Sequence, residues 1–273
     1  MADPSLRPDQ AGEAIAEEAR FGAAFLRRHG LRLLLLFIGV LLPMWAFAEL
    51  ADELHEGEVF FFDDPLLHFA HGMANAGFDN TFLLFSALGY LWGVVPFDVA
   101  FVFWLAIKRR YRSSLFAAVS FVGSALLNLA TKPVFARDRP SLWQSIAPES
   151  NYSFPSGHAM GSMTLACVCM LLAWPTRWRW PVIAASAIFV QMVGLSRIYL
   201  GVHYPSDILA GWAAAAAWVA CCFLLVFRRD GEESVFALVA RIRITRINTI
   251  FWRRADSPRA PGHSQNEADP PGL

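Results

Sequence analysis

The chain has 273 residues, 56% of them hydrophobic, and its formal net charge at pH 7 is zero. This composition is too apolar for an ordinary soluble domain and indicates the membrane class, while the balanced charge argues against a nucleic-acid partner. The four cysteines all lie in apolar runs without the histidine spacing of a zinc site, so we interpret them as core residues. The composition predicts an all-α membrane protein.

Six apolar stretches are long enough, or nearly so, for a membrane helix, which needs roughly 20 residues. They cover residues 31–50, 80–107, 114–131, 158–174, 180–198 and 205–227. We therefore expect a six-transmembrane-helix bundle over 31–227, after a cytoplasmic segment at 1–30. Residues 228–273 are expected to form a cytoplasmic basic segment and a disordered tail, since the end of the chain is rich in proline, glycine and polar groups.

Lysine and arginine residues orient the predicted helices, because short cytoplasmic loops carry the positive excess in membrane proteins. Basic residues before the first stretch, in alternate connections and after the last one define this side: Arg27, Arg28, Arg32, Lys108, Arg109, Arg110, Arg112, Arg177, Arg179, Arg228 and Arg229. We expect a multi-pass protein of the plasma or inner membrane with both termini in the cytoplasm. A cleaved secretion signal ending near 46–48 is the alternative for the first stretch, and it leaves the other loops on the same side.

A few basic residues on the predicted outer side depart from the charge rule. They are Lys132, Arg137, Arg139 and Arg197. All four lie in two short segments, at 132–140 and 196–207. These segments and a third at 153–158 also contain serine, histidine or aspartate. Because the third and fourth helices share one outer loop and the fifth and sixth share the other, these segments can meet. The sequence predicts an outward-facing active site between the last four helices.

The residue types in these segments predict an anion site. Charges near a bilayer are costly unless they meet a counter-ion. Arginine matches phosphate oxygens with a planar fork, lysine adds a compact charge, and the free amides at a helix start form a natural phosphate seat. The candidate phosphate-binding residues are Lys132, Arg139, Ser156, Gly157 and Arg197.

Two histidines and an aspartate add reactivity to this anion site. His203 and Asp207 are four residues apart at the start of the last helix, so the carboxylate can bond one ring nitrogen and leave the other to attack phosphorus. His158, in the other outer loop, can protonate the departing oxygen. Arg137 and Asp138 are interpreted as a local ion pair outside the catalytic set. The sequence offers no convincing metal cage.

The three segments resemble the signature of the type 2 phosphatidic acid phosphatase superfamily. That signature is Lys, six residues, Arg-Pro; then Pro-Ser-Gly-His; then Ser-Arg, five residues, His, three residues, Asp, and every specified position is present here. The resemblance implies a phosphatase without metal or cofactor, in which His203 becomes phosphohistidine, Asp207 orients it and His158 is the general acid. The five phosphate-binding candidates would hold the phosphoryl group.

The resemblance also implies a lipid substrate taken from the bilayer: a phosphate or diphosphate of the phosphatidic acid, phosphatidylglycerol phosphate or polyprenyl diphosphate class. A lipid phosphotransferase would use the same phosphohistidine, so it stays an alternative. A lipid-phosphate transporter is a third hypothesis, which the lack of internal repeats disfavours. The sequence leaves the particular lipid and the oligomeric state open.

Asp98 and three outer histidines require separate interpretations. Asp98 lies inside an apolar stretch, where a charge is expensive, so we expect it either to bond a neighbouring helix or to line a polar cavity, with a structural role favoured. His55, His68 and His71, in the first outer segment, are interpreted as ordinary interfacial residues.

Overall fold

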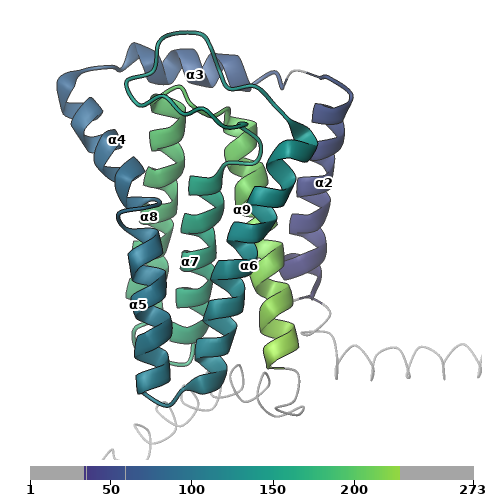
Figure 1. The fold of residues 1–273 in the computed structure, drawn as a ribbon, viewed down its shortest axis with the longest axis vertical. Helices are drawn as coiled ribbons and strands as arrows, with labels where there is room; N and C mark the ends of the chain where they lie inside the picture. The colour runs from purple at the N-terminus through teal and green to yellow at the C-terminus, as the bar shows by residue number, and fades with distance from the viewer. Residues whose placement is uncertain (1–33, 35, 59, 228–273) are drawn as a thin grey trace, which may run out of the picture. The chain divides into compact units, whose positions relative to one another are not determined.

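A computed structural model describes residues 34, 36–58 and 60–227, and within these ranges its regular secondary structure is entirely helical (Figure 1). The elements in chain order are η1 (Phe37–Leu41), α2 (Leu42–His55), α3 (Asp63–Gly72), α4 (Ala76–Leu88), α5 (Val94–Ile107), α6 (Tyr111–Phe135), α7 (Gly157–Ala173), α8 (Arg179–Tyr199) and α9 (Pro205–Val226). The predicted all-α class is therefore confirmed. The predicted segments at 1–30 and 228–273 lie outside the described residues.

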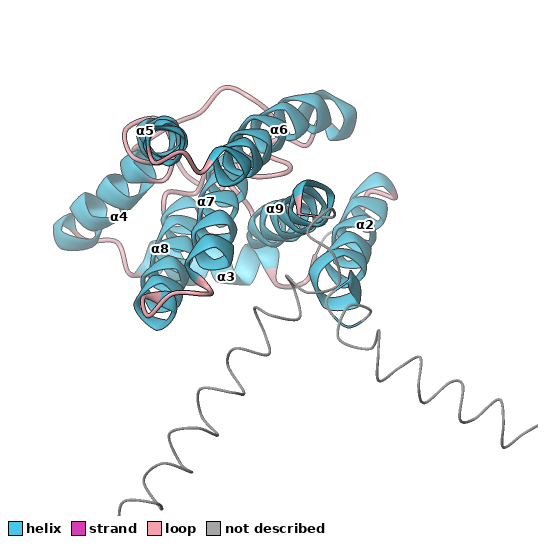
Figure 2. Ribbon diagram, turned by 90° about the horizontal axis from the view of Figure 1, so that it is seen from below, coloured by secondary structure: helices cyan, strands magenta, loops and turns pink. Residues whose placement is uncertain are grey.

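Helix α7 is the central element of the bundle. It packs against α5, α6, α8 and α9, while α2 covers α9 and α4 covers α8 (Figures 1 and 2). Helix α3 lies across one end of the bundle, and the α5–α6 and α7–α8 turns lie at the opposite end (Figure 1). The segments 136–156 and 200–204 lie at the end that α3 covers (Figure 1).

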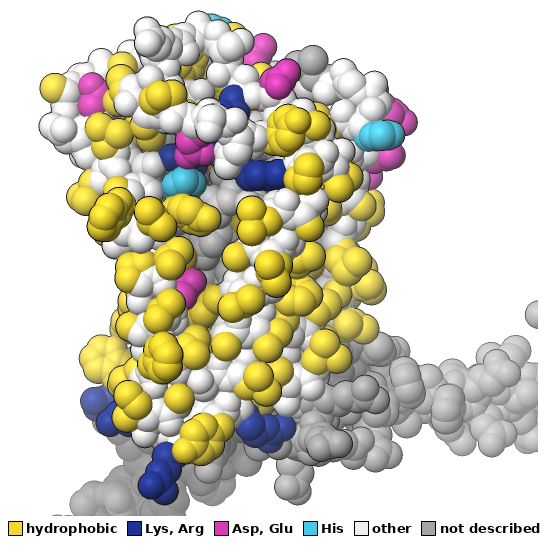
Figure 3. Space-filling model, viewed as in Figure 1, with side chains coloured by type: hydrophobic (Ala, Val, Ile, Leu, Met, Phe, Trp, Pro, Cys, Tyr) yellow, Lys and Arg dark blue, Asp and Glu magenta, His cyan; other side chains and the backbone are white. Residues whose placement is uncertain are grey.

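The described helices have the apolar character of a membrane protein. Helices α6, α8 and α9 are long and apolar enough to cross a bilayer by length and composition, and α5 and α7 are shorter apolar helices. Figure 3 shows hydrophobic side chains over the sides of the bundle and basic ones at the end with the α5–α6 and α7–α8 turns. This arrangement is the one expected of side chains that face lipid tails, with charged groups kept to an end.

The prediction of one helix over 80–107 is wrong. The structure has two helices there, because α4 ends at Leu88 and α5 begins at Val94. A Cβ on Gly93 would lie 2.1 Å from the carbonyl oxygen of Leu88, so only glycine permits this close turn. The break lets α4 pack against α8 while α5 packs against α6.

Local signals place the starts of α7 and α9 at the same end of the bundle. Ser156 precedes α7, and its Oγ accepts a hydrogen bond from the Ala159 amide at 3.5 Å. Pro205 opens α9, where proline costs no hydrogen bond, and the Asp207 carboxylate accepts the Tyr204 amide at 2.9 Å. Both helices therefore begin beside the loops that carry the predicted site residues.

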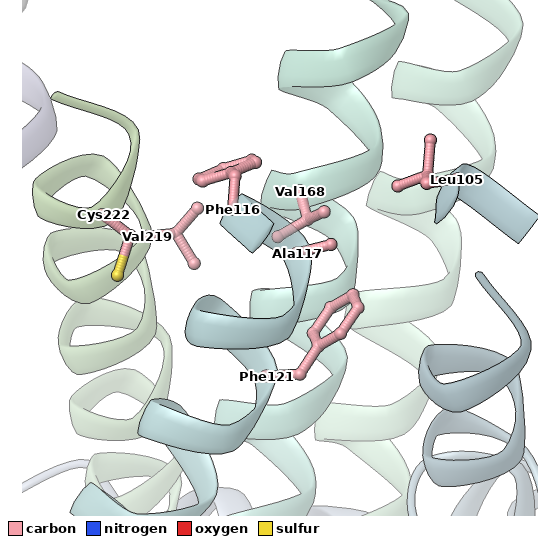
Figure 4. Close-up of a cluster of buried hydrophobic side chains, with 7 residues drawn as sticks. All are labelled: Leu105, Phe116, Ala117, Phe121, Val168, Val219 and Cys222. Carbon is pink, nitrogen blue, oxygen red and sulfur yellow. The ribbon is translucent and has the colours of Figure 1, made fainter. Parts of the chain in front are cut away.

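The core below this end is built from side chains of α5, α6, α7 and α9 (Figure 4). The buried members are Leu105, Phe116, Ala117, Phe121, Val168, Val219 and Cys222. All four cysteines are free, and Cys222 packs in this core as expected.

Near the site, helices α7 and α9 approach closely. A Cβ on Gly211 of α9 would lie 2.9 Å from the Ser156 carbonyl oxygen. The core and this contact fix the spacing of α7 and α9.

Candidate active site

The three predicted segments meet at one cavity of about 410 Å³. At the end of the bundle that α3 covers, the cavity is lined by Lys132 of α6, Glu149 of the following loop, Gly157 and His158 of α7, and His203. Lys132 and His203, which are 71 positions apart in the sequence, therefore line the same cavity. The convergence expected of the outer loops is present in the fold.

His203 and Asp207 form a buried pair at the start of α9. The ring Nδ1 lies 3.3 Å from Asp207 Oδ2, and the two side chains are 1% and 0% exposed. On the other side of the ring, Arg139 Nη1 lies 3.1 Å from Nε2. Arginine only donates hydrogen bonds, so Nε2 must accept and the ring proton must sit on Nδ1, facing the aspartate. The Nε2 lone pair thus points at the cationic side of the cavity.

The surroundings of His203 keep its imidazole neutral. Burial disfavours the charged ring, and the positive charges of Arg197 and Arg139 disfavour it further, so the pKa of His203 lies well below its ordinary value of 6.5. A neutral imidazole with one unprotonated ring nitrogen is the nucleophilic form. The position of the ring and its low pKa therefore both suit nucleophilic attack by Nε2.

A carboxylate occupies the centre of the cationic cluster. Arg139 Nη2 donates to Glu149 Oε2 at 2.6 Å, and Arg197 Nη2 donates to Glu149 Oε1. His158 Nδ1 lies 3.9 Å from the same Oε1. Burial alone would raise the pKa of Glu149, but the neighbouring Arg197 and Arg139 outweigh it and hold the pKa below its usual range. An anion therefore sits where the sequence predicted a phosphate, although this anion belongs to the chain itself.

Lys132 and Arg197 are also held by other groups of the protein. Lys132 Nζ donates to the Tyr152 carbonyl at 2.6 Å. Arg197 is 1% exposed, and its Nη1 donates to Ser86 Oγ of α4. Figure 3 shows acidic, basic and imidazole side chains next to one another above the hydrophobic sides of the bundle. The cluster is preorganised, because each charged side chain has a partner that sets its position.

The predicted local ion pair between Arg137 and Asp138 is wrong. Arg137 instead joins two buried carboxylates: its Nη1 lies 2.6 Å from Asp207 Oδ1, and its Nη2 lies 2.9 Å from Asp63 Oδ2 of α3. Asp63 also accepts the backbone amide and the hydroxyl of Ser206, at 2.9 and 2.6 Å. The guanidinium turns inward because these acceptors lie beneath the loop, with the Tyr204 ring 4.0 Å away on one side.

Ser156 and Gly157 have different places in the site. Ser156 is fully buried, does not line the cavity, and donates its backbone amide to the Asp207 carbonyl at 3.1 Å. Gly157 does line the cavity, and a Cβ there would lie 2.9 Å from Asn128 Oδ1. The structure thus brings Gly157 to the cavity wall and puts Ser156 behind it, where it links α7 to α9.

Two candidate functional residues, Glu149 and Asp63, were not predicted from the sequence. Glu149 is an acidic residue in a loop flanked by cationic motifs, nine positions before His158, and this charge contrast was its only signal. Asp63 lies 74 positions from Arg137, so its role could not be read from spacing. Within 34, 36–58 and 60–227, no group of three or more His, Cys, Asp and Glu side chains is arranged to hold a metal ion. The cationic lining suits an anion.

Comparisons with known proteins agree with this geometry. Residues 113–230 match the model of the PAP2 superfamily. Over 120 residues the chain is 33% identical to an undecaprenyl-diphosphatase of Sulfolobus acidocaldarius, covering 42% of this chain and 55% of that protein. Over 113 residues it is 33% identical to phosphatidylglycerophosphatase B of Bacillus subtilis, covering 38% and 54%. The matched part thus spans little more than half the length of these relatives.

The fold also has a counterpart among solved structures. The transmembrane PAP2 type phosphatidylglycerolphosphate phosphatase of Bacillus subtilis superimposes with a TM-score of 0.63, covering 69% of this chain and 98% of that chain at 23% identity. At this identity the likeness concerns the fold. It shows that the bundle described above shares the fold of that solved phosphatase.

Proposed function

We propose that this chain, whose residues 113–230 match the model of the PAP2 superfamily, is a membrane enzyme that hydrolyses a lipid phosphate or lipid diphosphate. Relatives of the chain act on an undecaprenyl diphosphate and a phosphatidylglycerophosphate, as their names state. Both are phosphate groups carried on lipids. The proposed reaction needs no metal, because lysine and arginine side chains supply the charge that stabilises the phosphoryl group.

One observation carries the proposal: the Nε2 lone pair of a neutral His203 faces a cluster of cations, while Asp207 lies behind the ring. Arg139 contacts both Nε2 and the carboxylate of Glu149. A phosphate in place of that carboxylate would therefore lie within reach of Nε2. Preorganised positive charge at such a place stabilises the equatorial oxygens of a phosphoryl-transfer transition state.

In the first step, His203 Nε2 attacks phosphorus and the bond from phosphorus to the lipid oxygen breaks. The departing oxygen takes a proton from the His158 imidazolium, which acts as the general acid. Asp207 stabilises the positive charge that develops on the His203 ring through Nδ1. The products of this step are the free lipid alcohol, or lipid monophosphate from a diphosphate, and a phosphohistidine.

In the second step, a water molecule attacks the phosphohistidine. His158, now neutral, accepts a proton from that water, and the bond from phosphorus to Nε2 breaks. Inorganic phosphate leaves, and His203 returns to its neutral form with the proton still on Nδ1. The Glu149 carboxylate then returns to Arg139 and Arg197. Each turnover consumes one water and needs no other reactant.

We propose that the cavity faces the extracytoplasmic side. The support is the distribution of basic residues: Lys108, Arg109 and Arg179 lie in or beside the turns at the end of the bundle opposite the site. Short loops with this composition are cytoplasmic as a rule. A lipid headgroup would then reach the site from the outer leaflet while its chains stay among the helices.

The experiment is phosphate release by the purified protein in detergent or proteoliposomes, against phosphatidic acid, phosphatidylglycerol phosphate and a polyprenyl diphosphate. We expect release from at least one of these lipids, and none from it by His203→Ala. The exposed His55, at the end of α2, provides the matched control, and His55→Ala should keep full activity. Phosphate release by His203→Ala at the wild-type rate would contradict the assignment of the nucleophile.

A further inference from the structure

The cavity does not end at the phosphate seat. Its wall continues along α6 from Lys132 to Phe121 and along α7 from His158 to Thr164, and Asp98 of α5 lies on the wall of this lower part. Eleven residues of an α-helix span about 16 Å, so the cavity extends deep into the bundle. The phosphate-binding end and the region around Asp98 thus belong to one continuous space.

Asp98 has the properties of a group that awaits a ligand. Its Oδ1 is buried and has no hydrogen-bond partner among the described residues. The nearby hydroxyls of Ser124 and Thr164 bond each other at 2.8 Å, and Thr164 also donates to the Met160 carbonyl at 2.7 Å. Two roles were expected for Asp98 from the sequence. Its Oδ1 makes no bond to a neighbouring helix, whereas its side chain does line the cavity. A buried carboxyl oxygen without a partner costs free energy, and ionisable residues inside membrane bundles commonly serve a function.

The depth of Asp98 relative to the phosphate seat follows from helix geometry. Helices α5 and α7 run in the same direction (Figure 1), and a Cβ on Gly161 of α7 would lie 3.8 Å from Val94 of α5. Gly161 lies three residues beyond His158, and Asp98 lies four residues beyond Val94. At 1.5 Å per residue, Asp98 sits about 10 Å deeper than His158.

We propose that Asp98 is a specificity-determining residue that accepts a hydrogen bond from a hydroxyl, amide or ammonium group of the substrate, about 10 Å below its phosphate. This inference rests on the proposed function. A carboxyl oxygen accepts a hydrogen bond whether or not the acid is ionised. The favoured substrates are then lipid phosphates that carry such donors at this depth, such as sugar- or amide-containing lipids, rather than polyprenyl phosphates whose chain is bare hydrocarbon.

The other residues that line the lower cavity are consistent with this preference for lipids that carry a donor. Val95, Phe121 and Leu129 give it apolar walls suited to hydrocarbon, and Asp98 is the acidic side chain in that part. A site that contains a buried hydrogen-bonding group rejects a ligand that leaves the group unpaired. A substrate with a donor would gain a hydrogen bond to Asp98. A substrate with a bare hydrocarbon chain would leave Asp98 unpaired and would therefore bind less well.

The test compares kcat/KM for two substrates: a long-chain alkyl monophosphate, and the same molecule with one hydroxyl about 10 Å along the chain from phosphorus. The wild type should prefer the hydroxylated molecule. Asp98→Leu should lower this preference about threefold to tenfold, the effect of one hydrogen bond. Asp98→Asn keeps one acceptor and should give an intermediate preference, which carries the test if Asp98→Leu does not fold.

Ser120 provides the matched control for these variants. It is buried in α6, its Oγ also lacks a partner among the described residues, and it does not line the cavity, so Ser120→Ala should leave the preference unchanged. The same preference in wild type and the Asp98 variants would overturn the inference while leaving the proposed function intact. A wild type that hydrolyses neither molecule nor any lipid phosphate would overturn the proposed function, and this inference with it.

Discussion

Arg137 Nη1 lies 2.6 Å from Oδ1 of Asp207, the carboxylate oxygen that does not face His203. The same guanidinium contacts Asp63 of α3, so one arginine joins the helix that lies across the bundle to the start of α9. Both carboxylates are at most 1% exposed. The carboxylate behind the proposed nucleophile His203 is thus held by an arginine that the sequence motif leaves unspecified.

Replacing Arg137 should damage both stability and activity. Arg137→Ala leaves the buried charges of Asp63 and Asp207 without their cation, a loss of about 3 kcal/mol or more. We expect a clearly lower unfolding midpoint in detergent and a fall in kcat greater than the fall in folded protein. Arg177→Ala, an exposed arginine in the α7–α8 turn, is the control and should change neither. An Arg137→Ala protein with wild-type unfolding would show that the bridge contributes nothing.

The Glu149 carboxylate should compete with phosphate analogues. Glu149→Gln removes the negative charge that Arg139 and Arg197 bind, so orthovanadate should inhibit phosphate release at a concentration roughly tenfold lower. Glu58→Gln, at an exposed acidic position, is the matched control. Weaker vanadate inhibition in Glu149→Gln would mean that this carboxylate orders the arginines for the anion rather than competing with it.

The acid limb of the pH profile should lie below the range of an ordinary histidine. Attack requires the neutral His203 ring, so activity is lost only as pH falls through the pKa of His203, which burial and the charges of Arg197 and Arg139 lower. We therefore expect kcat/KM to stay near its maximum at about pH 6.5, where a free imidazole is half protonated. Arg139→Gln removes one of these charges and should move the limb to higher pH. A wild-type limb centred on the ordinary value would contradict the described surroundings of the ring.

The contact between α7 and α9 should be sensitive to a single methyl group. A Cβ on Gly211 would lie 2.9 Å from the Ser156 carbonyl oxygen, a backbone atom that cannot turn away. Gly211→Ala should therefore destabilise the protein by about 1–3 kcal/mol, measured as a lower unfolding midpoint. Gly72, at the end of α3, has open space around it, and Gly72→Ala is expected to unfold like wild type. Equal midpoints for the two variants would show that the helices can separate without cost.

The long apolar runs made the helices after residue 110 predictable, because hydrophobic length alone specifies a membrane helix. The same criterion failed at 80–107. Hydropathy continues across the break between α4 and α5, whereas the break depends on the close approach that Gly93 permits. Helix α3, over Asp63–Gly72, was not expected, since it is short and carries polar residues.

Within the site, fixed spacing made the convergence of the histidines and the cations predictable. His158, His203 and Lys132 line one cavity, and Arg139 and Arg197 bind Glu149, which lines it as well. The roles assigned to them remain predictions. The partners that hold these groups were beyond reach of the sequence, because the bond of Arg137 to Asp63 and that of Arg197 to Ser86 join positions 74 and 111 residues apart. Such pairings follow from the packing of helices and have no local pattern.

The central claim is that His203 carries the phosphoryl group during turnover. The most direct measurement is mass spectrometry of the peptide that contains His203, from enzyme quenched with base during hydrolysis of a lipid phosphate. We predict a phosphoryl group on His203 in the wild type and none on the same peptide from His203→Ala. Phosphate release with the phosphoryl group on another residue, or with no phosphoryl group on either His203 or His158, would contradict the account.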